Sequence, residues 1–196
     1  MGADTDFKTL YDHFSTYCTL TPEEWELAKS YFEFSSLDKK EVIYSAGSTA
    51  LKHYFVTSGC LHMYLVNDKG DDQTLQFAIN SWWITDYLAF QQRRSSEFYI
   101  QAVEPSRVLS ITPEKQDKLL ARIPKLEVYF RNIYQTAYGA AINRMKYIFT
   151  YSKEEIYYSF RDAFPDFVNS VPQYLVATYL GLSPEYVSKL KKKSLS

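Results

Sequence analysis

Few residues in this 196-residue sequence are of the kinds that build metal centres or covalent frameworks. There are two cysteines, Cys18 and Cys60, and three histidines. Two thiols are too few for a disulfide framework, a four-thiolate zinc site or an iron–sulfur cluster. The spacing of His13, His53 and His62 is not that of a metal site. We therefore expect no metal, no iron–sulfur cluster and a reducing compartment.

Long apolar runs are absent as well. No uninterrupted apolar stretch approaches the roughly 18 residues that a membrane span needs. A secretory signal has an apolar run behind a basic cluster, and residues 1–10 contain no such run. We therefore expect a cytoplasmic protein with no membrane partner. Aromatic residues are plentiful at 17%, including 18 tyrosines, so large rings can build the core.

Charge is distributed unevenly although the net charge is only −1. Residues 1–143 carry 14 Lys and Arg against 18 Asp and Glu, whereas residues 144–196 carry 8 against 5. The stretch from Val187 to Ser196 holds four lysines and no acid. A small basic C-terminal module suits a polyanion such as DNA. A solvated lysine tail is the alternative that charge alone leaves open.

The first two-thirds of the chain change from a helical to a strand pattern. The stretch Thr21–Glu24 combines an N-cap, a proline and a capping-box glutamate, so it predicts a helix that reaches about Phe34. From Glu41 to Ile111, β-branched and aromatic residues alternate with turn signals such as Asn67–Gly70. Several short strands at this spacing predict an antiparallel sandwich or barrel.

Helical patterns take over from Thr112, with a short helix expected over 113–123 and a long one over about 125–151. Along the long helix, a set of mostly apolar residues recurs at alternate spacings of four and three, which is typical of a two-stranded coiled coil. This predicted seam consists of Leu126, Phe130, Ile133, Ala137, Ala140, Arg144, Tyr147 and Tyr151. We favour a homodimer through this helix. A single amphipathic helix packed on its own domain is the alternative.

The last segment, about 153–196, predicts three short helices, of which Pro165 ends the first. Its second half, residues 171–192, reads VPQYLVATYLGLSPEYVSKLKK. Gly181 suits the left-handed position at a helix end, and Ser183-Pro184 suits the cap and first position of the next helix. Small and apolar residues would pack the two helices together. The pattern predicts a helix-turn-helix, whose second helix enters the major groove of DNA.

The outward face of that second helix carries side chains suited to DNA. Glu185 can accept from cytosine, Lys189 can donate to guanine and Ser188 can do either. Lysines near the helix end suit phosphates. The residues that we expect at the DNA are Gln173, Ser183, Pro184, Glu185, Tyr186, Ser188, Lys189, Lys191, Lys192 and Lys193.

With these motifs, roughly residues 20–193 resemble the Crp–Fnr superfamily, the cyclic AMP receptor protein and its relatives, and in particular the short form common in Bacteroidetes. The helix-turn-helix carries most of the resemblance. The stretch GSTALKHYFVTSGCLHMYLVNDKG, the Gln101–Glu104 stretch and the Ile123–Leu126 stretch also match landmarks of the family. The base-reading places of the family fall on Pro184, Glu185, Ser188 and Lys189. The family usually has Arg at the first and last of these, so the operator preference should differ.

The resemblance implies an α+β fold in three parts. They are a β-roll sensor domain of the cyclic-nucleotide-binding, jelly-roll type with an N-terminal helix (1–124), a dimerisation helix (125–152) and a winged-helix-like helix-turn-helix domain (153–196). It implies a homodimeric transcription regulator on a two-fold symmetric operator, with no enzymatic activity. Double-stranded DNA is the expected partner, and RNA polymerase is a further candidate.

The cyclic-nucleotide site of the family does not carry over. That site needs a Gly-Glu pair and a later Arg-Ser or Arg-Thr pair. Thr85-Asp86 stands at the first place and Ser96-Glu97 at the second, where a carboxylate would repel the phosphate. Arg94-Ser95 would supply such a pair, but it lies two residues before the aligned position. We expect no cyclic AMP, and no haem, because His53 and His62 have the pattern of ordinary strand residues.

Two interpretations of the sensor remain open. In the first, an unidentified small-molecule effector binds in a pocket lined by Trp82, Trp83, Thr85, Asp86, Tyr87, Arg94 and Ser95. In the second, the two tryptophans fill the β-roll core and there is no effector. Two other functions compete with a regulator: a cupin-like enzyme, which would need a cluster of histidines and a carboxylate, and a ligand-sensing dimer that acts through protein contacts without specific DNA binding.

Overall fold

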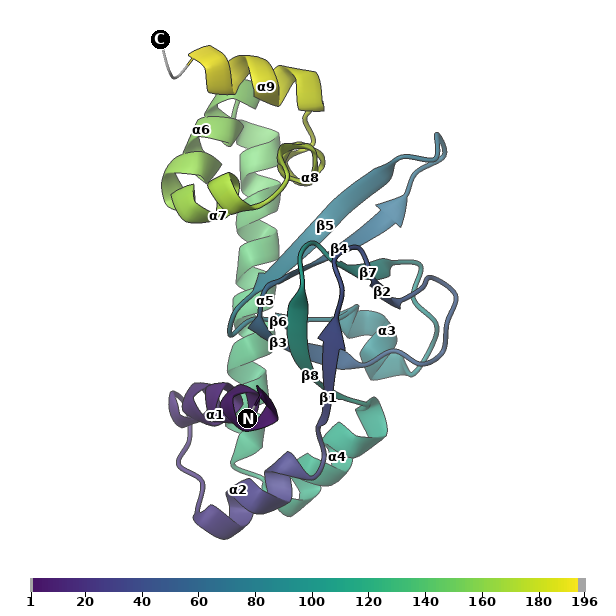
Figure 1. Ribbon diagram of the computed structural model, residues 1–196, viewed down its shortest axis with the longest axis vertical. Helices are drawn as coiled ribbons and strands as arrows, with labels where there is room; N and C mark the ends of the chain where they lie inside the picture. The colour runs from purple at the N-terminus through teal and green to yellow at the C-terminus, as the bar shows by residue number, and fades with distance from the viewer. Residues whose placement is uncertain (1, 194–196) are drawn as a thin grey trace. The chain divides into compact units, whose positions relative to one another are not determined.

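In the computed structural model, which describes residues 2–193, the chain folds into two units (Figure 1). The first consists of Met1–Leu65 and Gln76–Tyr134. The second consists of Val66–Leu75 and Gln135–Ser196. The sequence-based division, after residues 124 and 152, cuts the chain differently, and its outermost residues, 1 and 194–196, lie outside the described part.

Two antiparallel sheets form the body of the first unit, as the β-roll expectation requires. One has the strand order β1-β8-β3-β6 and the other β2-β7-β4-β5. The strands are β1 (Glu33–Leu37), β2 (Val42–Tyr44), β3 (His53–Ser58), β4 (Cys60–Val66), β5 (Asp72–Ile79), β6 (Trp83–Ile84), β7 (Tyr99–Ala102) and β8 (Ser106–Ile111). The mixture of this sheet pair with helices confirms the α+β class.

The helices of the first unit are α1 (Gly2–Ser15), α2 (Pro22–Lys29), α3 (Tyr87–Gln92) and α4 (Pro113–Arg122). The sequence analysis missed α1, although Phe7, Leu10 and Phe14 have helical spacing. The capping box of Thr21 and Glu24 is present at α2. The expected end near Phe34 is wrong, because residues from Glu33 on pair with β8 as strand β1.

Large aromatic rings build the core of this unit, and their polar tips are paired. Tyr129 is fully buried; its hydroxyl accepts from Trp83 Nε1 at 2.7 Å and lies 2.6 Å from Nδ1 of His13. This chain links α1, β6 and the first turns of the long helix α5 (Leu126–Thr150). Burial lowers the pKa of His13. The core of the first unit therefore extends onto α5.

The second unit contains the rest of α5 and four short helices rather than the three expected. They are α6 (Lys153–Ala163), α7 (Pro165–Ser170), α8 (Gln173–Leu180) and α9 (Pro184–Lys193). Pro165 follows the end of α6, as predicted, but also opens α7, because proline is tolerated at a first helical position. Ser152 and Glu155 form a capping box at α6.

The second unit also includes the tip of a hairpin, Val66–Leu75. The side chain of Asn67 accepts from the backbone N–H groups of Lys69 and Asp71, and Gly70 has φ +82°. This confirms the predicted turn at Asn67–Gly70. None of the helices described in the chain is long and apolar enough to cross a membrane.

Candidate nucleic-acid interface

Helices α8 and α9 pack through the residues that the sequence pattern placed inside. Leu175, Val176 and Ala177 of α8 are buried, as are Val187 and Leu190 of α9. Ala177 has no accessible surface, which agrees with a small residue at the place where the two helices approach closely. The two helices therefore form the helix-turn-helix pair expected from the sequence.

The turn between them has the predicted chemistry. Gly181 ends α8 in the left-handed conformation, with φ +70°. An added Cβ there would meet no atom within 4 Å, so this backbone angle, rather than space, favours glycine. Ser183 caps α9, since its hydroxyl accepts from the N–H of Tyr186 at 3.2 Å. Leu182 is buried beneath the turn.

The opposite face of α9 is open to solvent. Pro184, Glu185 and Lys189 are exposed, and Tyr186 and Ser188 are partly exposed. Glu185 and Lys189 lie four residues apart, on one side of the helix. The lysines from Lys191 to Lys193 occupy the last turn. Acceptor and donor groups thus precede a run of positive charge on one helix.

The side chains of Lys193 and Gln173, both expected at DNA, are bonded to other residues of the chain. Lys193 Nζ pairs with Glu154 Oε1 at 2.8 Å, and this hydrogen bond raises the pKa of Lys193. Gln173 Nε2 donates to the backbone carbonyl of Pro184 at 3.3 Å, so it joins the starts of α8 and α9. Beside it, the exposed Tyr174 is a candidate phosphate contact that the sequence analysis missed.

The predicted dimer seam does not lie on one exposed face of α5. Phe130 is buried and Ile133 packs against the core of the first unit, so the seam is wrong at these positions. Arg144 is partly buried and bonded within its own unit. Ala137, Ala140 and Tyr147 are at least partly exposed. The buried side of the first turns of α5 therefore belongs to the core of the first unit.

A different stripe of α5 carries exposed apolar side chains. Tyr138, Ile142, Met145 and Phe149 follow one another at spacings of four, three and four residues. Their exposed fractions are 70%, 44%, 50% and 78%. Large apolar groups in this repeat are the pattern of a helix that packs against another helix.

The residues expected around an effector differ in their burial. Trp83 and Thr85 are buried, whereas Trp82 is 47% exposed. Tyr87 packs edge-to-face on His53, and the partly exposed Ser95 is a neighbour of the buried Ser96. Arg94 is exposed, and its Nε donates to the side chain of Gln92 at 2.8 Å. Trp83 thus fills the core as in the second interpretation, and Trp82 does not.

The two segments aligned with the family's nucleotide site do lie together. Asp86 caps α3 by accepting from the N–H groups of Leu88 and Ala89, both at 3.1 Å. Its other carboxylate oxygen accepts from the hydroxyl of Ser96 at 2.8 Å. The protein's own carboxylate thus occupies donors that could otherwise bind an anion.

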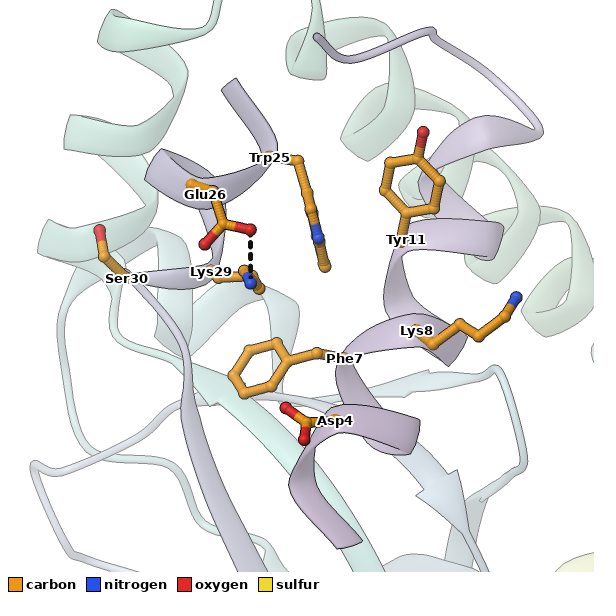
Figure 2. Close-up of a pocket in the computed structure, with 8 residues that line it drawn as sticks. All are labelled: Asp4, Phe7, Lys8, Tyr11, Trp25, Glu26, Lys29 and Ser30. Carbon is orange, nitrogen blue, oxygen red and sulfur yellow. Dashed lines mark ion pairs between the residues drawn. The ribbon is translucent and has the colours of Figure 1, made fainter. Parts of the chain in front are cut away.

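An open groove lies elsewhere in the first unit, between α1 and α2 (Figure 2). It has a volume of about 610 Å³, and none of the expected effector residues lines it. The rings of Phe7, Tyr11 and Trp25 project toward it in Figure 2, beside the ion pair of Lys29 with Glu26. The part of the chain that the structure describes contains no group of three potential metal ligands.

Comparison with protein families identifies residues 34–123 as matching the cyclic nucleotide-binding domain. The matched segment runs from β1 to the end of α4, which is most of the sensor unit. Comparison with curated proteins gave no match.

Similar solved structures extend the likeness over nearly the whole chain. One is the catabolite activator protein of Thermus thermophilus, with a TM-score of 0.56 and 20% identity over 90% of this chain and 84% of that one. Another is the c-di-GMP-responsive global regulator CLP of Xanthomonas campestris, with a TM-score of 0.69 and 12% identity over 89% and 92%. A third, from Eubacterium rectale, is assigned to the Crp/Fnr family of transcriptional regulators; its TM-score is 0.68, with 15% identity over 89% and 83%.

Residues 34–123 therefore match the cyclic nucleotide-binding domain, and the chain as a whole shares the fold of these solved structures. This confirms the resemblance that the sequence motifs indicated.

Proposed function

We propose that this chain is a DNA-binding transcription regulator that binds a two-fold symmetric operator as a homodimer, and that it is not an enzyme. The observation that carries the proposal is the exposed face of α9. It presents Glu185, Ser188 and Lys189 on one side while Val187 and Leu190 anchor the other side in the core. A recognition helix needs this division between an anchored face and a polar reading face.

The homodimer is proposed through the exposed stripe of α5 formed by Tyr138, Ile142, Met145 and Phe149. Apolar side chains exposed at a 4-3-4 repeat on one helix are stabilised when a second copy covers them. A two-fold dimer then presents two α9 helices to DNA, which predicts an inverted repeat with half-site centres about one helical turn apart.

The proposal includes no effector at the residues first considered for one. Trp82 and Arg94 are exposed while Trp83 and Thr85 are buried, and none of the four lines the groove between α1 and α2. The Asp86–Ser96 hydrogen bond likewise supports the expectation that cyclic AMP does not bind.

Selection of duplexes from a randomised library by the full-length protein tests the proposal. We expect enrichment of an inverted repeat, and a binding constant that falls steeply as salt rises, because α9 carries several lysines. A variant with Glu185→Ala and Lys189→Ala together, both on the exposed face, is the matched control and should lose the enrichment while staying folded. A pool that stays random with the wild-type protein would contradict DNA recognition and favour a dimer acting through protein contacts.

A further inference from the structure

Arg144 lies on α5 but interacts with two other segments of its own unit. Its Nη1 donates to the carbonyl of Leu75 at 2.7 Å, and its Nη2 donates to the carbonyl of Tyr179 at 2.6 Å and to that of Thr74 at 3.4 Å. The guanidinium also lies over the ring of Tyr179, 4.3 Å from its centroid. We call this set, Arg144 with Thr74, Leu75 and Tyr179, the carbonyl clamp. It joins the hairpin tip 66–75 to α8.

The carbonyl clamp requires a particular geometry of the two segments that it joins. All three acceptors are backbone carbonyls, so the guanidinium fork responds to the exact placement of two main chains. Arg144 is partly buried, and its Nε is buried without a hydrogen-bond partner in the described structure. Burying a cation is costly unless its geometry is well satisfied. Lysine, with a single ammonium, could not span the two segments in the same way.

Hydrogen bonds between the same segments reinforce the clamp. The hydroxyl of Thr178 donates to the hydroxyl of Thr74 at 3.0 Å. The side-chain amide of Gln73 donates to the backbone carbonyl of Thr178. The hairpin tip therefore holds the C-terminal half of α8 at several polar groups, just before the Gly181 turn.

Fixing α8 also fixes α9, because the two helices share the buried core described above. Simultaneous docking of two recognition helices into two half-sites loses less entropy when each helix is already oriented. Binding to one half-site does not need that relative orientation. A residue that orients α8 should thus matter for a two-half-site operator and matter little for an isolated half-site.

We propose that Arg144 is a positioning residue, which through the carbonyl clamp holds the helix-turn-helix on the hairpin tip 66–75 and thereby sets affinity for the full operator. This inference rests on the proposed function. It differs from the sequence-based expectation, which placed Arg144 in the dimer seam.

The test uses the full-length protein with Arg144→Lys, and with Arg131→Lys as the matched control, an exposed arginine on the same helix. Hydrogen exchange read by mass spectrometry needs no DNA. We expect amides of 72–75 and 179–182 to exchange at least tenfold faster in Arg144→Lys, with no change in Arg131→Lys. On duplexes selected by the wild-type protein, Arg144→Lys should bind the inverted repeat at least tenfold more weakly and a single half-site within about twofold of wild type.

The outcomes separate the inference from the proposed function. Unchanged exchange in Arg144→Lys would overturn the clamp whatever the DNA result. Faster exchange with unchanged or tighter operator binding, or with equal losses on both duplexes, would overturn the positioning role. If the wild-type protein selects no DNA, the proposed function and the DNA half of this inference fail, while exchange still decides whether the clamp exists.

If Arg144→Lys does not fold, Thr178→Val, which removes the bond to Thr74, should show the same changes at smaller size.

Discussion

Lys189 and Lys191 are only two residues apart on α9, yet the proposed function gives them different roles. Lys189 is exposed one turn after Glu185, on the side of the helix opposite Val187. Lys191 lies in the last turn, next to Lys192 and Lys193. Contacts to base edges discriminate between sequences, whereas contacts to phosphates only position the protein.

We predict that Lys189→Ala costs roughly 1–3 kcal/mol at the selected operator and relaxes the preference at one base pair. Lys191→Ala should weaken all sequences about equally and lower the salt slope by about one. Binding curves on operator and scrambled duplexes measure both effects, and Lys118→Ala, an exposed lysine of the sensor unit, should change neither. An equal loss on both duplexes for Lys189→Ala would show that it is not a reading residue.

His53 is a buried histidine in an aromatic environment. Its ring lies 4.2 Å from that of Trp83 and also contacts Tyr87, Phe90 and Tyr134. Nδ1 is 3.4 Å from Oε1 of Gln116, and Nε2 has no hydrogen-bond partner in the described structure. Burial lowers the pKa of His53 to about 3, so the folded state holds the neutral ring.

This low pKa predicts a specific dependence of stability on pH. Between the unfolded pKa near 6.5 and the folded pKa near 3, the unfolded state binds more protons, so stability rises with pH in that range. His53 should contribute a slope of up to about 1.4 kcal/mol per pH unit. Urea unfolding of wild type and His53→Phe between pH 4 and pH 7 measures the difference. Identical pH profiles for the two proteins would show that folding does not lower the pKa of His53.

At the scale of elements, α5 has two faces with different uses. Near its start, Phe130 faces the sensor core, whereas Tyr138, Ile142, Met145 and Phe149 face solvent further along. Repeats of four and three residues occur on both faces, so spacing alone does not identify the interface. Burial of Leu126 and Phe130 in the core of the first unit removes the start of the predicted seam.

Ile142→Glu should therefore yield monomers, because it places a charge in the middle of the exposed stripe. Ala137→Glu, which tests the sequence-based seam, should disturb the dimer less. Analytical ultracentrifugation of both variants over a range of concentrations distinguishes the two seams. A monomeric Ala137→Glu beside a dimeric Ile142→Glu would restore the seam expected from the sequence.

At the scale of the whole molecule, the fold is shared with the similar solved structures, but the two segments aligned with the family's nucleotide site carry different residues. Asp86 caps α3 and bonds to Ser96, and Glu97 follows at an exposed position. Carboxylates therefore stand where a phosphate would need positive charge. A fold shared with the catabolite activator protein does not by itself imply the same effector.

We predict that the full-length protein does not bind cyclic AMP at physiological concentrations. Titration calorimetry with cyclic AMP should show only heats of dilution, and the nucleotide should leave operator binding unchanged. Micromolar affinity in the calorimeter would contradict the prediction and would mean that the Asp86–Ser96 bond opens for the ligand.

Local features of this protein were predictable from short stretches of sequence. Caps at Thr21 and Ser183, the glycine at the end of α8 and the turn at Asn67–Gly70 all depend on backbone angles and on hydrogen bonds within three or four residues. The helix-turn-helix was predictable because its core positions and its turn lie within one continuous segment. The end of α2 was mispredicted because pairing with β8, far along the chain, takes residues from Glu33 onward.

The sequence by itself thus determined the class of fold, the helix pair α8–α9 and the chemistry of the outward face of α9. Only the tertiary structure decided which stripe of α5 is exposed, which acceptors hold Arg144 and that Asp86 meets Ser96. The physical reason is the separation along the sequence over which each interaction acts. Capping and periodicity act between near neighbours, whereas burial and the pairing of buried polar groups depend on segments brought together from distant parts of the chain.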